Sequence, residues 1–263
     1  MMLILIIMSN FVHIIPLGLE KDRNIYLLKE YPPSKVYFLT YTSKSKDEMD
    51  YIDLVEDIKD EMESLMPLAE KKLVTVSYED FEEIFITVFE IMIKEKQAGN
   101  EVIMHVHSGP RMADFAAWLA ASITNTKTYY LRAAHYLPKG EKVTSAGVLK
   151  VIDLLRVPVI IPTQLQAYFL EYLSDNKGVI TGSLRSFVNK LGMEKFGKIK
   201  SINSAIVSMS HCIRELKREQ FIVIKGVSRK RQRIEITDLG RLTARAYKIL
   251  KENKVSLSSI SVR

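Results

Sequence analysis

The sequence has 263 residues, of which 47% are hydrophobic and 26% charged, and its formal net charge at pH 7 is +7. This composition is that of a globular protein and excludes a chain that is disordered throughout, while the length allows one large domain or two ordinary ones. A single cysteine, Cys212, excludes an intramolecular disulfide and a metal site built from several cysteines. It also agrees with a reducing compartment.

The charge is distributed unevenly along the chain. Residues 1–162 hold 18 Lys and Arg against 23 Asp and Glu, a net charge of −5, whereas residues 163–263 hold 20 against 8, a net charge of +12. A half this basic favours a polyanionic partner; the alternative is a solvated, lysine-rich face.

The first eight residues are apolar. The run is shorter than the roughly 20 residues that a membrane-spanning helix needs. It also has no basic segment and no small-residue cleavage site of the kind found in signal peptides. We therefore interpret residues 1–8 as an N-terminal extension, and we expect a cytoplasmic protein without a membrane partner.

From residue 11, short apolar runs alternate with amphipathic segments. Strands are predicted at residues 11–16, 35–41, 73–76, 101–106 and 128–132. Helices are predicted at residues 46–66, 81–96 and 111–123, and a further one opens at residues 20–23. This alternation indicates βαβ units, so residues 1–135 are predicted to form a Rossmann-like α/β domain with a mainly parallel sheet.

Residues 136–162 are predicted to be a connector, because Pro158 and Pro162 bracket an extended piece. The pattern then changes to short helices, predicted at residues 164–175, 183–191 and 201–220. Two strands at residues 221–225 and 233–237 flank a basic turn, and a last helix opens at residue 238. This series is typical of a winged helix-turn-helix, predicted over residues 163–263.

The predicted third helix is long enough to enter the major groove of DNA and read base edges from its first turns. The DNA contacts predicted there are Lys198, Lys200, Ser201, Asn203, Ser204 and Ser208. Those predicted at the hairpin, to phosphates or an adjacent minor groove, are Arg229, Lys230, Arg231 and Arg233. Helix capping is the alternative for the serines, solubility is the alternative for the hairpin, and a winged helix can also bind proteins. The charge of +12 favours double-stranded DNA.

Two loops follow strands of the predicted sheet. Leu17-Gly18 follows the first strand, with Lys21 and Arg23 one turn further on, and His107–Arg111 follows the fourth. Ligands of open α/β sheets bind outside the carboxyl ends of the strands. Backbone N–H groups at a helix start, together with an arginine, favour an anion such as a phosphate. An ordinary turn is the alternative.

Several of these segments resemble one family: His13–Gly18, Gly99–Val102, Ser108–Arg111, Tyr129-Tyr130 and Val157–Val159. From Phe11 to Arg263 the chain resembles archaeal regulators that join a CRISPR-associated Rossmann fold (CARF) domain to a winged helix. The resemblance implies a homodimer in which the loops after the first and fourth strands meet and bind a cyclic oligoadenylate. Carried over by position, the pocket residues would be Leu17, Gly18, Ser108, Gly109, Pro110 and Arg111.

The turn departs from the family's usual pattern of Asn before a Ser/Thr-Gly-Gly run, because His105, His107 and Pro110 stand here. Some CARF proteins resemble ring nucleases that cleave their own ligand. We expect His105 and His107 to point to opposite faces of the strand, so that only His107 reaches the pocket, as a phosphate contact or general base. A structural, hydrogen-bonded histidine is the alternative.

The sequence shows no paired carboxylates, nucleophile elbow, P-loop or convincing metal cluster, so no cofactor or metal is expected. The leading hypothesis is a homodimeric, ligand-responsive transcription regulator of a CRISPR or related antiviral defence locus. Its partners would be double-stranded DNA and a cyclic oligoadenylate or similar anionic ligand. A ring nuclease, or a sensor of another small ligand or of a protein partner, is the alternative.

Overall fold

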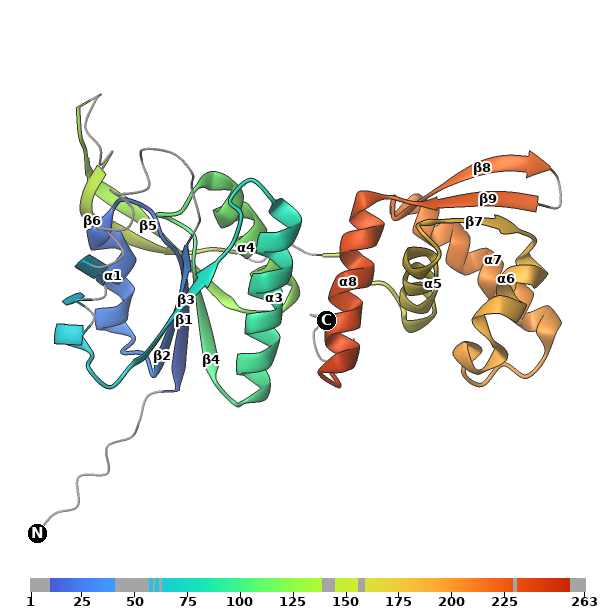
Figure 1. Cartoon of the computed structure of the whole chain (residues 1–263), viewed down its shortest axis with the longest axis horizontal. Helices are drawn as coiled ribbons and strands as arrows, with labels where there is room; N and C mark the ends of the chain where they lie inside the picture. Colours follow the sequence, from blue (N-terminus) through green and yellow to red (C-terminus); the bar gives the residue numbers. More distant parts are fainter. Residues whose placement is uncertain are drawn as a thin grey trace, which may run out of the picture. The chain divides into compact units, whose positions relative to one another are not determined.

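The computed structural model describes residues 10–40, 57–58, 60–61, 63–138, 145–155, 159–228 and 231–255. The chain divides into two compact units, with the boundary between residues 158 and 159 (Figure 1). The N-terminal extension predicted at residues 1–8 lies outside the described residues, as does most of the helix predicted at residues 46–66.

The first unit is built on a six-stranded sheet. Its strands are β1 (Phe11–Pro16), β2 (Lys35–Thr40), β3 (Glu70–Thr75), β4 (Glu101–His105), β5 (Lys127–Tyr136) and β6 (Ser145–Asp153). Their order is β3-β2-β1-β4-β5-β6, in which neighbouring strands from β3 to β5 are parallel and β6 is antiparallel to β5. The prediction of a mixed α/β fold with a mostly parallel sheet is therefore confirmed.

Helices cover both faces of this sheet (Figure 1). Helix α1 (Lys21–Glu30) lies on one face, and α3 (Phe81–Gln97) and α4 (Arg111–Ile123) pack together on the other. The chain moves outward from β1 to β3 and then returns to place β4 on the opposite side of β1. The strand order thus reverses between β1 and β4, which is where open α/β sheets bind ligands.

The predicted connector is wrong in its first part. Strand β5 continues to Tyr136, and residues 145–153 return beside it as the edge strand β6. The alternation of apolar residues is weak there because β6 is covered incompletely: Leu149 is 60% exposed. A register shift between Arg132 and Ala133 and a positive φ at Gly147 interrupt the pattern further.

The second unit combines helices with a small antiparallel sheet. Its elements are α5 (Gln164–Asp175), β7 (Val179–Gly182), α6 (Leu184–Leu191), a 3-10 turn η1 (Met193–Phe196), α7 (Ile202–Arg218), β8 (Ile222–Ser228), β9 (Arg231–Ile236) and α8 (Asp238–Glu252). The sheet order is β7-β9-β8. Strand β7 was not predicted, because a four-residue strand is too short to show a period of two.

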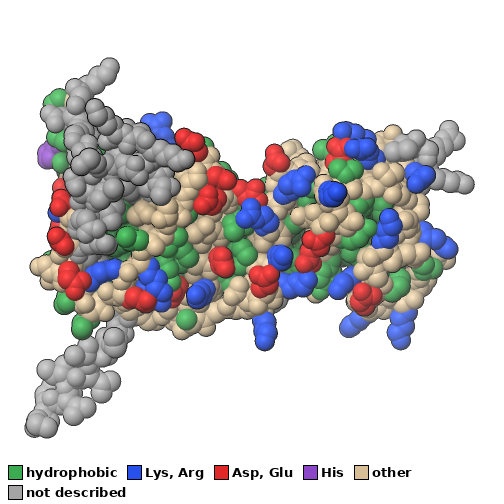
Figure 2. All heavy atoms as spheres, viewed as in Figure 1, with side chains coloured by type: hydrophobic (Ala, Val, Ile, Leu, Met, Phe, Trp, Pro, Cys, Tyr) green, Lys and Arg blue, Asp and Glu red, His purple; other side chains and the backbone are tan. Residues whose placement is uncertain are grey.

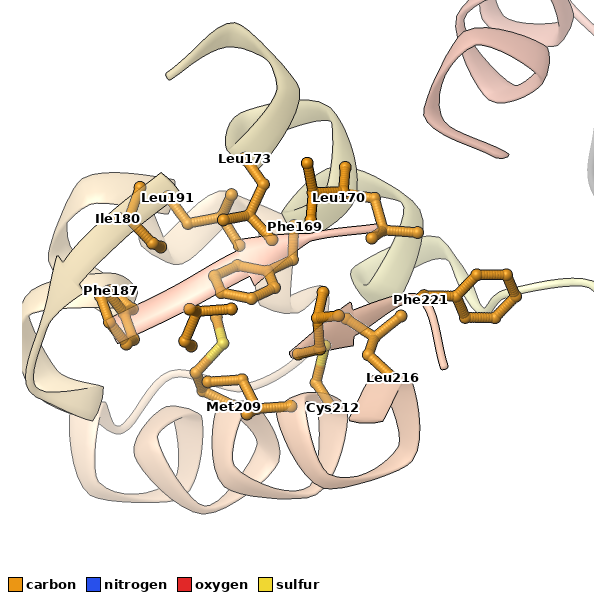
Figure 3. Close-up of a cluster of buried hydrophobic side chains, with 14 of the residues drawn as sticks. Phe169, Leu170, Leu173, Ile180, Phe187, Leu191, Met209, Cys212, Leu216 and Phe221 are labelled. Atoms are coloured by element: carbon orange, nitrogen blue, oxygen red, sulfur yellow. The ribbon is translucent and has the colours of Figure 1, made fainter. Parts of the chain in front are cut away.

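The core of this unit joins helices α5, α6, α7 and α8 to the sheet; Figure 3 shows part of it. Phe169 from α5 and Phe187 from α6 are fully buried, with ring centroids 6.0 Å apart. Met209 and Cys212 extend from the inner face of α7 into the same core, where burial raises the pKa of the Cys212 thiol to about 12. This packing fixes which face of α7 points outward.

Candidate functional site

The loops after β1 and β4 touch through their backbones. A Cβ atom on Gly18 would lie 1.3 Å from the carbonyl oxygen of Ser108, and one on Gly109 would lie 2.5 Å from the Cβ atom of Pro16. At two positions that the sequence predicted as site residues a side chain would therefore clash, with the Ser108 backbone at Gly18 and with the Pro16 ring at Gly109. The structure brings the two loops together at the point where the strand order reverses.

Asn24 and Ser108 connect the two loops. The side-chain amide of Asn24 donates to the carbonyl oxygen of Gly18 at 2.9 Å, and the Ser108 hydroxyl donates to the side-chain oxygen of Asn24. Asn24 is fully buried and Ser108 is 7% exposed. The Ser108 side chain is therefore engaged in holding the loops, so its role at the site is structural.

His107 is also a structural residue. It is 6% exposed, and its Nε2 atom lies 2.8 Å from the carbonyl oxygen of Arg23, to which it donates. Burial lowers the pKa of His107 to about 4, so the ring is neutral near pH 7. Of the two roles considered from the sequence, this geometry favours the hydrogen-bonded structural histidine over a phosphate contact or general base.

His13, His105 and His107 form a buried row. His13 Nδ1 lies 2.8 Å from His105 Nε2, and the His105 and His107 ring centroids are 5.2 Å apart. The expectation that His105 and His107 point to opposite faces is wrong, because residues two apart in a strand share a face. Burial lowers the pKa of all three rings.

The start of α4 faces the outer side of these loops. Pro110 and Arg111 are exposed, whereas Leu17 is only 1% exposed and belongs to the core. Pro110 occupies the N-cap position, and no side chain of the described residues caps this end of α4. The free helix start and the guanidinium of Arg111 form an electropositive surface suited to an anion.

Arg23 and Asp114 complete the floor of this site, although the sequence marked Arg23 only as a neighbour of the first loop and did not mark Asp114. Arg23 is 7% exposed, and a guanidinium nitrogen lies 3.1 Å from Glu20 Oε1. Among the described residues, neither Arg23 Nε nor Asp114 Oδ1 has a hydrogen-bond partner, although both atoms are buried. Desolvation raises the pKa of Asp114 to about 8, against the opposing charge of Arg23.

In the second unit, most predicted DNA contacts lie at the surface. Figure 2 shows Lys and Arg side chains over much of the visible face of this unit. Exposed are Lys198, Lys200, Ser201, Asn203, Ser204, Arg231 and Arg233, while Ser208 is half-buried. Arg229 and Lys230 lie outside the described residues.

Two details modify the charge of this surface. Glu235 Oε1 lies 2.8 Å from Arg233 Nε, and Glu235 Oε2 lies 2.8 Å from Lys225 Nζ, so one carboxylate partly neutralises two cations of the hairpin. The outer face of α7 also carries His211 and Arg214, which were not predicted. Their exposure depends on which face of α7 packs inward.

A family model matches part of the first unit. It is described as "HFX_2341_N:-like, N-terminal" and matches residues 11–136. No curated protein matches the sequence. Within the part of the chain that the structure describes, no helix is long and apolar enough to span a bilayer, and no three metal-ligating side chains are grouped to hold an ion.

The solved structures that are similar to this chain include the following three. One is "Enterococcus italicus Csm6 bound to cyclic hexa-2'-fluoro-hexa-dAMP", with 11% identity and a TM-score of 0.42 over 80% of this chain and 55% of that one. The second is "Can2 from Sulfobacillus thermosulfidooxidans in complex with cyclic tetra-adenylate", with 12% identity and 0.40 over 92% and 65%. The third is VC1899 from Vibrio cholerae, with 11% identity and 0.39 over 92% and 66%. This chain thus spans less than two thirds of the length of each.

Replacing Gly18 with alanine should force the two loops apart, because the obstacle to the new Cβ atom is the backbone of Ser108. We expect the free energy of unfolding to fall by about 1–3 kcal/mol, measured by urea unfolding followed by circular dichroism. Gly226→Ala is the control, since no described atom lies within 4 Å of its Cβ position. Equal stability of Gly18→Ala and the wild type would contradict the close loop contact.

Replacing Asp114 with asparagine should stabilise the protein at alkaline pH. Folding raises the pKa of Asp114 from 3.8 to about 8, so the wild type is most stable with respect to this group below about pH 4 and loses stability progressively as the pH rises to about 8. We expect Asp114→Asn to gain about 1–3 kcal/mol over the wild type at pH 8.5, and less at low pH, in urea unfolding across this range. Asp153→Asn, at an exposed position of β6, is the control. A difference for Asp114→Asn that is constant with pH would refute the assignment.

Proposed function

We propose that this protein is a ligand-responsive, DNA-binding transcription regulator of a CRISPR or related defence locus. In this proposal the first unit is a CARF-like sensor and the second is a winged helix-turn-helix. The observation that carries it is the coincidence of charge with structure. The unit up to residue 158 has a net charge of −5, and its strand order reverses as it does in α/β sheets that bind ligands. The unit from residue 159 has a net charge of +12, and the exposed face of its helix α7 is mostly polar.

The ligand proposed for the first unit is a cyclic oligoadenylate, the class that the resemblance implies. Its phosphates would lie at the start of α4, beside the Arg111 guanidinium and the backbone N–H groups of the first turn. Arg23 is paired with Glu20, but its buried Nε atom has no partner among the described residues and adds a hydrogen-bond donor beneath the loops. These features support an anionic ligand, and the resemblance supplies its identity.

A second copy of the chain is proposed to cover this ligand. Three large apolar side chains lie exposed around the paired loops: Leu19 at 40%, Met112 at 43% and Phe115 at 61%. Met112 and Phe115 are three residues apart on α4 and so share one face of the helix. Apolar surface next to a polar pocket is typical of a subunit contact, which supports a dimer with the ligand in its cleft.

In the proposed winged helix-turn-helix, α7 enters the major groove and the β8–β9 hairpin approaches the backbone of the duplex. Helix α7 has 17 residues, with most of its apolar side chains packed inward and most of its polar ones outward. Lys198 and Lys200 stand just before its start, where phosphates flank the groove. A ligand that changes the arrangement of two sensor units would alter the fit of two winged helices to their half-sites.

DNA binding should depend on the lysines before α7. We expect duplex DNA to be bound with strong salt dependence, measured by fluorescence anisotropy at several salt concentrations. The Lys198→Ala/Lys200→Ala variant should bind more weakly, with the slope of log K against log salt smaller by about 2. Lys29→Ala/Lys94→Ala removes two exposed lysines of the first unit and is the matched control. Affinity that is absent or indifferent to salt would exclude the regulator.

Ligand binding should depend on Arg111. We expect cyclic tetra-adenylate to bind the wild type in calorimetry, and Arg111→Ala to weaken binding by about 1.5–3 kcal/mol, as for a charged hydrogen bond. Arg132→Ala, at an exposed position of β5, should leave it unchanged. Chromatography of the recovered nucleotide should show an intact ring. Cleavage would favour the ring nuclease. Equal affinity of the wild type and Arg111→Ala would show that the ligand does not bind at the loops after β1 and β4.

A further inference from the structure

The exposed face of α7 has an unusual distribution of side chains. Its first three turns present uncharged hydrogen-bonding groups, and charged groups occur only outside them. The exposed polar residues of these turns are Asn203, Ser204, Ser210 and His211, preceded by Lys198 and Lys200 and followed by Arg214 and Lys217. Cations at the two ends suit phosphates, whereas neutral donors and acceptors in the middle suit base edges.

Val207 is the one apolar residue on this face among those that the structure describes. It is 57% exposed, and it does not pack against the core that holds Ile202, Ile206 and Met209 on the same helix. Asn203 and His211 stand one turn before and one turn after it, so it lies at the centre of the polar stretch.

Neither packing nor helix formation accounts for valine at this position. A side chain more than half exposed gains little from burial in the folded monomer. Valine is also a poorer helix former than alanine, because its branched Cβ atom loses rotamer freedom. The residue therefore has a chemical property that is unused within the chain: a compact apolar surface surrounded by hydrogen-bonding groups.

We infer that Val207 contacts the 5-methyl group of a thymine in the major groove and so determines one base of the DNA site. The thymine methyl is the apolar group that the four base pairs display in that groove, whereas the other groups there are hydrogen-bond donors and acceptors. The neighbouring Asn203 and His211 can bond to the polar edges on either side. This inference rests on the proposed DNA-binding function and names the base feature that α7 recognises.

The test begins with selection of the preferred duplex from a random library by the full-length protein. Each thymidine of the selected site is then replaced in turn by deoxyuridine, which lacks only the methyl group. For the wild type, one such replacement in each half-site should weaken binding about four-fold, as expected for losing one buried methyl. Val207→Ala should weaken binding to the thymidine duplex by a similar factor and should no longer distinguish the two bases at that position.

Val223→Ala is the matched control, because Val223 is also an exposed valine of the second unit, with 46% exposure, and lies near the start of β8, at the end of the hairpin away from its turn. This variant should retain the wild-type preference for thymidine. Circular dichroism should show both variants folded, and both should keep the salt dependence of the wild type. The combination of a methyl effect in the wild type and Val223→Ala with its loss in Val207→Ala supports the inference.

Two results overturn it, and they differ from failure of the proposed function. If DNA binding is salt-dependent but no deoxyuridine replacement matters, α7 does not read a thymine methyl. If Val207→Ala still distinguishes the two bases, another residue makes that contact, and Val207 is free for a protein partner. Absence of salt-dependent DNA binding would instead refute the proposed function and, with it, this inference.

Discussion

The loops after β1 and β4 meet through their backbones, at a distance that leaves no room for a Cβ atom on residue 18. Parallel neighbouring strands end at the same edge of a sheet, so the strand order alone brings these loops side by side. The glycine then allows direct contact, and the buried Asn24 and Ser108 side chains bond the loops together. The start of α4, which follows the second loop, is held in place by the same contact.

Beneath these loops lie two ionisable side chains with buried polar atoms, Arg23 and Asp114, and burial disfavours the charged form of each. Arg23 is paired with Glu20, but its Nε atom and the Oδ1 atom of Asp114 are buried without partners among the described residues. Unsatisfied buried polar atoms reduce stability, and a functional role is one reason for which natural proteins retain them. Both residues adjoin the loops after β1 and β4: the Arg23 carbonyl bonds to His107, and Asp114 Oδ1 lies 3.2 Å from the Cβ position of Gly109.

The second unit depends on a different constraint, the packing of α7. Its inner residues join the core around Phe169 and Phe187, and this fixes the opposite face outward. The result is a surface with neutral polar groups around Val207 and lysines or arginines beyond them. Glu235 forms ion pairs with Lys225 and Arg233 of the hairpin. The net charge of +12 therefore overstates the positive charge that the hairpin presents.

The sequence by itself determined the alternation of strands and helices in residues 11–136, the strand-end glycines and the concentration of positive charge after residue 159. These features are local, since periodicity and composition are read within short windows. Only the tertiary structure decided that β6 completes the sheet, that His107 is buried beside His105, and that Asp114 lies under the loops. Each of these depends on contacts between segments far apart in the chain, and burial of a polar side chain leaves no mark in the residues next to it.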